Sequence, residues 1–188
     1  GGTLASEAAM MIKHSLGEEE IKDEGFTYKS ASHEVIDLGD DMYTQGKPHP
    51  MIDPEKRIEK LETSADSEDT AVIMLDNVIG YGSHADMASE LAPTIKRITD
   101  KAASEERSLV VLATVVGTDK DAQGYDKQRQ ILEEAGAVIC DTNDQMVRTA
   151  IELIGGKVVQ PELEIKAFDK GTEAVSYTHL RAHETDSY

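Results

Sequence analysis

The sequence predicts an α/β fold in which a parallel sheet is flanked by helices. Short apolar runs at residues 71–75, 109–113 and 137–140 have the length and continuity of strands that are buried on both faces. A fourth run, residues 35–38, precedes them and contains one acidic residue. Segments with helical spacing of apolar residues separate the four runs, and this alternation is typical of right-handed parallel layers.

The first predicted helix begins at Thr3, a plausible N-cap, continues to Leu16 and ends at Gly17. An acidic connection leads from it to the strand at residues 35–38. This strand opens into a loop, residues 39–54, which is acidic and bent by glycine and proline. Because open α/β sheets carry their chemistry in loops at the carboxyl ends of parallel strands, we expect a site in this loop.

The middle of the chain repeats the unit of helix and strand. Asp53, Pro54 and Glu55 have the order of an N-cap, a first-turn proline and a first-turn acid, which predicts a helix start. After the next strand a helix begins near residues 83–86. Pro93 should kink or restart this helix, because proline removes a backbone hydrogen bond and crowds the preceding turn.

The last part of the chain contains two further helices. One extends from about residue 125 to 135 and ends at Gly136. Thr142 and Gln145 have the spacing of a capping box and predict the start of the other. Its apolar positions recur on one face, which predicts that this face packs against the sheet.

Composition excludes two classes of partner. The chain has 188 residues with 37 Asp and Glu against 19 Lys and Arg, giving a formal net charge of −18. Such a field repels phosphate backbones, so we expect no nucleic-acid binding. No apolar run approaches the length of a membrane span, so we expect no membrane association. The single cysteine, Cys140, lies in an apolar run and is expected to be buried and inert.

The chain is expected to hold one core domain, residues 1–156, followed by a C-terminal extension, residues 157–174. Residues 175–185 resemble the translation of a transposase-type sequencing adapter, so residues 175–188 are expected not to be native and not to belong to the fold. With no initiator Met at its start, the chain is expected to be a fragment.

Several ordered motifs resemble the FdrA family of acyl-CoA synthetase-like proteins, which is similar in turn to the α subunit of succinyl-CoA synthetase. The motifs are Gly2-Thr3-Leu4 with Glu7-Ala8, His33 to Asp41, Pro48 to Pro54, and Val116 to Asp119 with Asp121-Ala122-Gln123. The resemblance covers roughly residues 1–155. It implies a flavodoxin-like CoA-ligase domain, cytoplasmic, that lacks its N-terminal CoA-binding domain and works with partner protein subunits.

The same resemblance implies CoA and a magnesium-bound nucleotide as cofactors, bound mainly outside this fragment, which alone is expected to be inactive. Acyl transfer through an acyl phosphate or a CoA thioester is the reaction implied. The expected ligands are therefore a small carboxylate, an acyl phosphate or carbamoyl phosphate. No HExxH or CxxC spacing supports a transition-metal site.

Two predicted anion-binding positions lie at loop and helix starts. Gly2 and Thr3 open a helix, whose free N–H groups and dipole favour negative charge; the matching helix of the succinyl-CoA synthetase α subunit points at the active-site phosphate. Gly117 and Thr118 follow a strand and are expected to hold the same anionic group. A plain helix cap remains the alternative for Thr3.

The predicted loop after residues 35–38 supplies further candidates. Gly39 and Asp40 match a Gly-Gly-Asp loop of the α subunit; the acids could bind Mg²⁺ or substrate donors, or simply stabilise a turn. His49 lies between two prolines and could serve as a base or ligand, although a lone loop histidine is more often neither. Asp76, after the second strand, matches the position of an acid that orients the phosphorylated histidine in the relatives.

One departure from the family pattern limits what the resemblance implies. The α subunit carries its phosphohistidine after the strand that matches residues 109–113, and the corresponding loop here, residues 115–124, contains no histidine. A Thr or Asp cannot replace an imidazole as a reversible phosphoryl carrier. His84 is the nearest substitute but lies one strand–helix unit too early. Two alternatives therefore stay open: a subunit of a carbamoyltransferase in nitrogen catabolism, or a noncatalytic regulatory or scaffold domain.

Overall fold

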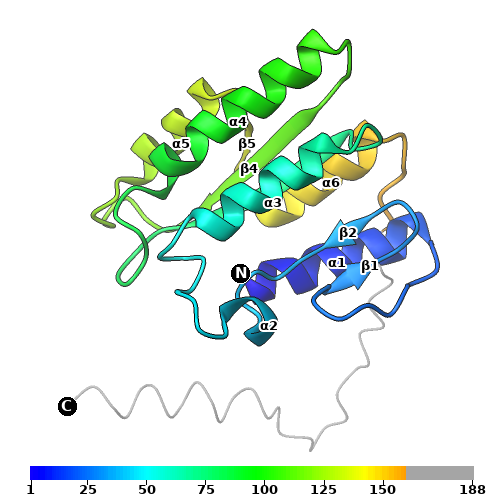
Figure 1. The fold of residues 1–188 in the computed structure, drawn as a ribbon, viewed down its shortest axis with the longest axis horizontal. Helices are drawn as coiled ribbons and strands as arrows, with labels where there is room; N and C mark the ends of the chain where they lie inside the picture. The colour runs from blue at the N-terminus through cyan, green and yellow to red at the C-terminus, as the bar shows by residue number, and fades with distance from the viewer. Residues whose placement is uncertain (160–188) are drawn as a thin grey trace, which may run out of the picture.

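The computed structural model describes residues 1–159. Within them the chain forms an α/β unit with a three-stranded parallel sheet and a separate two-stranded hairpin (Figure 1). Most of the extension expected at residues 157–174 lies outside the described residues, and the stretch 175–188 lies wholly outside them.

Helices and strands alternate through most of the described chain. The helices are α1 (Gly2–Leu16), α2 (Asp41–Thr44), α3 (Glu55–Asp66), α4 (Met87–Ser104), α5 (Tyr125–Glu134) and α6 (Asn143–Leu153). The strands are β1 (Tyr28–Lys29), β2 (Glu34–Val35), β3 (Val72–Val78), β4 (Val110–Val116) and β5 (Val138–Cys140). The predicted α/β class with a parallel sheet between helices is confirmed.

The strand expected at residues 35–38 does not belong to the parallel sheet. Only Glu34 and Val35 are extended enough to pair, and they pair antiparallel with β1, Val35 beside Tyr28. Val35 and Tyr28 are buried against α1 and α6 instead. The prediction was wrong because an apolar run reports burial and does not identify the partner that covers it. The acidic loop that follows is therefore not at the carboxyl end of a parallel strand.

The parallel sheet has the order β3-β4-β5. Strands β3 and β4 are longer than the apolar runs that predicted them, because they pair in register from Val72 with Val110 to Val78 with Val116. Asp76 and Asn77 consequently lie inside β3 and not after it, which corrects the sequence-based boundary.

Helices cover both faces of the sheet. Side chains such as Ile73 and Val111 point to the face packed by α3, α4 and α5, while Leu112 and Cys140 point to α6. Helix α1 lies outside α6 and next to the hairpin (Figure 1). Leu91 in α4 is fully buried, and burying such a side chain stabilises the fold by roughly 1.5–3 kcal/mol.

Helix α1 begins one residue earlier than Thr3. Its N-cap is Gly1, whose carbonyl oxygen accepts from the Ala5 amide at 2.9 Å. Thr3 lies exposed within the first turn and is not the N-cap, so its predicted capping role was wrong. The end of the helix was predicted correctly, because Gly17 has φ +65° and donates to the Lys13 carbonyl at 3.1 Å.

The acidic loop after the hairpin is partly helical. Asp40 is the N-cap of α2, and its Oδ1 accepts from the Met42 amide at 3.0 Å. At the start of α3, Asp53 Oδ1 accepts from the Glu55 amide at 2.9 Å. Asp53 thus supplies the expected capping bond, although Pro54 is the residue directly before the helix.

Pro93 neither breaks nor restarts α4, which is continuous from Met87 to Ser104. Of the predicted kink or restart, the restart was wrong, because Pro93 lies in the first half of the helix and removes only one backbone bond, to the carbonyl of Ser89, an exposed residue within reach of water.

The ends of α5 and α6 follow the sequence signals more closely. Gly136 follows Ala135, the C-cap of α5, and has φ +104°. At α6 the Thr142 hydroxyl oxygen accepts from the Gln145 amide at 3.1 Å. The Gln145 side chain reaches one residue further back than expected and accepts from the Asp141 amide at 2.8 Å.

Candidate functional site

Polar side chains from all three strands of the sheet form a row near its carboxyl edge. Asp76 lies beside Thr114, and Thr114 lies beside Cys140. Paired residues of a parallel sheet point to the same face, and Cys140 points to α6. The row therefore lies under α1 and α6, which places it near the N-terminal ends of two helices.

The N-terminus of α1 meets Asp76. The Gly1 nitrogen donates to Asp76 Oδ2, and the Arg57 guanidinium of α3 donates to the Asp76 carbonyl oxygen. Arg57 Nη2 also lies 3.7 Å from Asp76 Oδ1, with 13% and 21% of the two side chains exposed. A carboxylate of the protein thus occupies the position that a helix N-terminus offers to an anion.

Burial and charge act in opposite directions on this pair. Burial disfavours the charged form of Asp76, but the Arg57 guanidinium and the Gly1 nitrogen outweigh it and hold the pKa of Asp76 below its ordinary value. Burial lowers the pKa of Arg57, and the Asp76 charge works against that change. Asp76 is therefore an ionised acceptor near neutral pH and not a proton donor.

Asp37, Gly39 and His49 complete the surroundings of the α1 N-terminus. Asp37 Oδ1 accepts from the Gly39 amide at 2.9 Å. A Cβ atom on Gly2 would lie 2.7 Å from Asp37 Oδ2, and one on Gly39 would lie 2.8 Å from His49 Nε2. Both glycines leave room for this close approach, and a larger residue at either position would force the Asp37 or the His49 side chain to move. The His49 side chain is exposed, and its Nδ1 accepts from the Met51 amide at 3.1 Å.

Gly117, Thr118 and His84 belong to a second group of loops, after β3 and β4. The Thr118 amide and hydroxyl donate to Asp121 Oδ2 at 2.6 and 3.1 Å. A Cβ on Gly117 would lie 2.2 Å from the Ile79 side chain. Asp121 thus accepts from both donors of Thr118, just as Asp76 accepts from the Gly1 nitrogen at the start of α1.

Gln123 ties these loops together. Its amide donates to the Gly80 carbonyl at 2.9 Å and to the His84 carbonyl at 3.3 Å. His84 Nδ1 accepts from the Asp86 amide at 3.0 Å. The His84 amide donates to the Met51 carbonyl at 2.8 Å, so the loops that carry the two candidate histidines touch.

A pocket of about 480 Å³ opens between residues 80–85 and 120–123.

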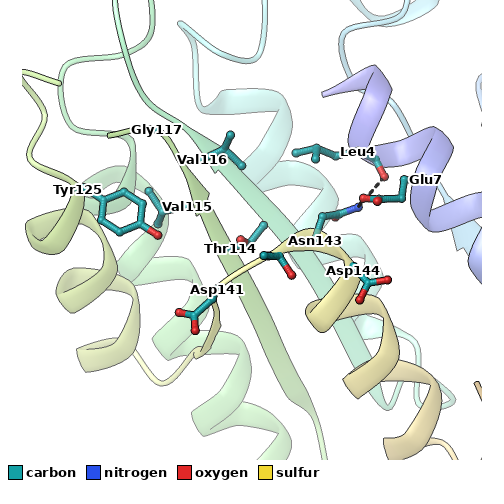
Figure 2. Close-up of a pocket in the computed structure, with 11 residues that line it drawn as sticks. Leu4, Glu7, Thr114, Val115, Val116, Gly117, Tyr125, Asp141, Asn143 and Asp144 are labelled. Atoms are coloured by element: carbon teal, nitrogen blue, oxygen red, sulfur yellow. Dashed lines mark hydrogen bonds between the residues drawn. The ribbon is translucent and has the colours of Figure 1, made fainter. Parts of the chain in front are cut away.

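A different pocket, of about 360 Å³, lies between α1, the ends of β4 and β5, and the N-terminus of α6. We name it the α6 pocket. Figure 2 shows Leu4 and Glu7 of α1 facing Asn143, with Thr114, Val116 and Asp141 around the opening. Gly117 is the one predicted site residue in its lining.

The structure thus brings together only some of the predicted residues. Gly2, Gly39, His49 and Asp76 surround the N-terminus of α1, with exposed Thr3 in its first turn. The remaining residues lie elsewhere: Asp40 caps α2, and His84, Gly117 and Thr118 lie in the loops after β3 and β4.

Sequence reasoning missed Arg57, Asp37 and Thr114. Arg57 lies in a helix with an ordinary charged pattern, so only its burial beside Asp76 distinguishes it. Thr114 lies within an otherwise apolar strand and is 1% exposed. A hydroxyl inside an apolar run is a signal that the sequence offered, since buried polar groups need partners.

Within residues 1–159, no three His, Cys, Asp or Glu side chains converge as a metal ion would require. Burial raises the pKa of the Cys140 thiol, which agrees with the expected buried, inert cysteine. In the same part of the chain, none of the helices is both long and apolar enough to cross a membrane.

The comparisons with known proteins agree with this architecture. The model of the CoA-ligase family matches residues 1–153. The uncharacterized protein YahF of Escherichia coli (strain K12) is 41% identical over 161 residues, which cover 82% of this chain and 31% of YahF. The chain therefore spans about a third of the length of that relative. With the parallel sheet, the helical layers and the family match in agreement, the chain belongs to the CoA-ligase family, as a domain related to acyl-CoA synthetases.

Proposed function

We propose that this CoA-ligase domain binds the phosphate or carboxylate of an activated acyl group at the N-terminus of α1 and takes part in acyl transfer through an acyl phosphate or CoA thioester. The observation that carries the proposal is the meeting of the α1 N-terminus with the half-buried pair of Arg57 and Asp76, within a domain that matches the CoA-ligase family over residues 1–153. An FdrA-type protein remains the proposed context.

The chemistry of this position suits an exchange of anions. The N–H groups of Gly2 and Thr3 are free of intrahelical partners, as in the first turn of any helix. Arg57 supplies a positive charge that Asp76 now balances. An incoming phosphate would compete with the Asp76 carboxylate for the Gly1 nitrogen and the Arg57 charge, and His49 and Asp40 lie in the loops that would border it.

Loop residues 117–124 contain no histidine, so we propose that this domain does not use a phosphohistidine at that position. Direct transfer of a carbamoyl group needs no phosphohistidine, and this makes a carbamoyltransferase subunit the second candidate. CoA, a magnesium-bound nucleotide and partner subunits would then bind mainly through other parts of the assembly. A scaffold domain would bind the same anions without any turnover.

Thr3 offers a sharp test of anion binding. Thr3→Pro removes one N–H from the first turn, where proline is tolerated, while Thr3→Ala removes the hydroxyl and keeps the N–H. Acetyl phosphate and carbamoyl phosphate would be titrated into the 188-residue chain and followed by amide chemical shifts. We expect Thr3→Pro to weaken binding about tenfold, as for a lost hydrogen bond to a charged group, and Thr3→Ala to bind as the parent does. Equal binding by all three would refute the site.

The route of the phosphoryl group is tested separately. The protein, with its partner subunits, would be incubated with ATP, acetyl phosphate or carbamoyl phosphate and mapped by mass spectrometry under alkaline conditions. Turnover without phosphohistidine would support direct transfer. Phosphate on His49 or His84 would instead show a relay with a relocated nucleophile.

A further inference from the structure

The α6 pocket contains a buried hydroxyl that has no partner. Thr114 is 1% exposed, and its Oγ1 makes no hydrogen bond within the described residues. A buried hydroxyl without a partner costs roughly 1–3 kcal/mol. Thr114 lines the α6 pocket and points to the face of the sheet that carries α6, so its hydroxyl is aimed toward the pocket (Figure 2).

Helix α6 supplies the other donors. Thr142 satisfies the amide of Gln145, but the amides of Asn143 and Asp144 are the first two of the helix and have no intrahelical partner. The positive end of the helix dipole adds to their attraction for an oxygen ligand. An oxygen group in the α6 pocket would therefore meet backbone donors and the Thr114 hydroxyl together.

Carboxylates around the pocket limit the charge that it accepts. Asp141 is paired with Arg129 at 2.7 Å and Asp144 with Arg148 at 2.6 Å. Glu7 accepts a hydrogen bond from the Asn143 side-chain amide at 2.5 Å. Among the described ion pairs, it is the lining carboxylate that has no cation as its partner. A single negative charge on the ligand is thus tolerable, whereas a doubly charged phosphate is opposed.

The rest of the lining is apolar. Leu4 of α1 and Val116 at the end of β4 face the pocket, and the Tyr125 ring closes one side with its hydroxyl accepting from Arg129 at 2.9 Å. Such a wall accommodates a short hydrocarbon chain.

We infer that the α6 pocket binds a short monocarboxylic acid, with its carboxylate at the α6 N-terminus and the Thr114 hydroxyl and its chain against Leu4, Val116 and Tyr125. This deepens the proposed function and rests on it for its role, because it names the place of the carboxylate co-substrate beside the α1 anion site. The two sites share helix α1, which contributes Leu4 and Glu7 to the pocket.

Propionate is the probe, titrated into the full 188-residue chain without any phosphate and followed by the amide shifts of Asn143 and Asp144. Thr114→Val removes the hydroxyl at constant shape and should raise the dissociation constant about tenfold. Because that hydroxyl has no partner, the variant should be at least as stable as the parent, so weaker binding would not report unfolding. Thr149→Val, on α6 outside the pocket, is the matched control and should bind as the parent does.

Glu7→Gln provides a test in the opposite direction. It removes the uncompensated charge and keeps an acceptor for Asn143, so propionate should bind several-fold more tightly. Equal binding of propionamide, tighter binding of inorganic phosphate at the same amides, or no effect of Thr114→Val would each overturn the inference. Acetyl phosphate binding at Gly2 and Thr3 is a separate titration, so failure of one site is distinguishable from failure of the other.

Discussion

At the scale of single residues, Gln128 holds three elements together from a fully buried position. Its Oε1 accepts from the Asn77 amide of β3 at 3.1 Å and from the Ala88 backbone of α4 at 3.0 Å. Its Nε2 donates to Asp86 Oδ1 at 2.7 Å. This network fixes the start of α4 against β3 and so positions the loop that carries His84.

Replacing Gln128 with Leu should destabilise the fold by about 3 kcal/mol, because two buried N–H groups lose their acceptor. Urea unfolding would measure the loss. Gln130→Leu, on the exposed side of the same helix, is the control and should change stability by less than about 0.5 kcal/mol. Similar losses for both variants would contradict the importance of the buried network.

The ionisation of Asp86 makes the free energy of unfolding depend on pH. Burial opposes its charge, but hydrogen bonds from Lys127, Gln128 and Ser89 outweigh that effect and lower the pKa of Asp86 to about 2. A lowered pKa stabilises the fold at pH values above the unfolded pKa near 4, and this stabilisation is lost as the pH falls toward 2.

We expect Asp86→Asn to lose about 1–2 kcal/mol at pH 7 and to show a flatter stability curve between about pH 4 and 2. Thermal unfolding across that range would measure both effects. The exposed acid Asp126, changed to Asn, should leave the curve unchanged. An Asp86→Asn protein with the full acid dependence of the parent would show that other carboxylates cause it.

At the scale of elements, helix starts decide where the candidate site lies. Sequence signals located most starts and ends within a few residues, and Gly17 and Gly136 were read correctly because positive φ there favours glycine. Thr3 was misread as a cap because the preceding glycine had already begun the helix. The hydrogen bond from the Met42 amide to Asp40 agrees with the turn-stabilising alternative for that acid, here at the start of α2.

Helix α4 tolerates Pro93 at a cost. Pro93→Ala would restore a backbone donor to the Ser89 carbonyl, and it should stabilise the protein by about 1–2 kcal/mol once the greater freedom of the unfolded chain is counted. Chemical denaturation would measure the gain. Ala92→Gly, one residue earlier, should have the opposite effect. No gain from Pro93→Ala would show that packing around α4 compensates fully for the proline.

At the scale of the whole molecule, the net charge of −18 is the dominant property. Repulsion between like charges destabilises the folded state of a chain with a large net charge, and salt screens this repulsion. We expect the melting temperature to rise between about 0.01 M and 0.15 M NaCl, over which the Debye length falls from about 30 Å to about 8 Å. A falling melting temperature would show that the local surface ion pairs outweigh the overall repulsion.

The sequence by itself determined the fold class, the three buried strands and most helices, because burial imposes apolar runs and helical spacing that can be read locally. It also carried the motifs that resemble the family. Only the tertiary structure decided which strand joins the sheet, that Arg57 meets Asp76 at the start of α1, and that Thr114 faces a pocket without a partner. These facts depend on contacts between residues distant in the chain, and periodicity along the chain does not encode which surfaces meet.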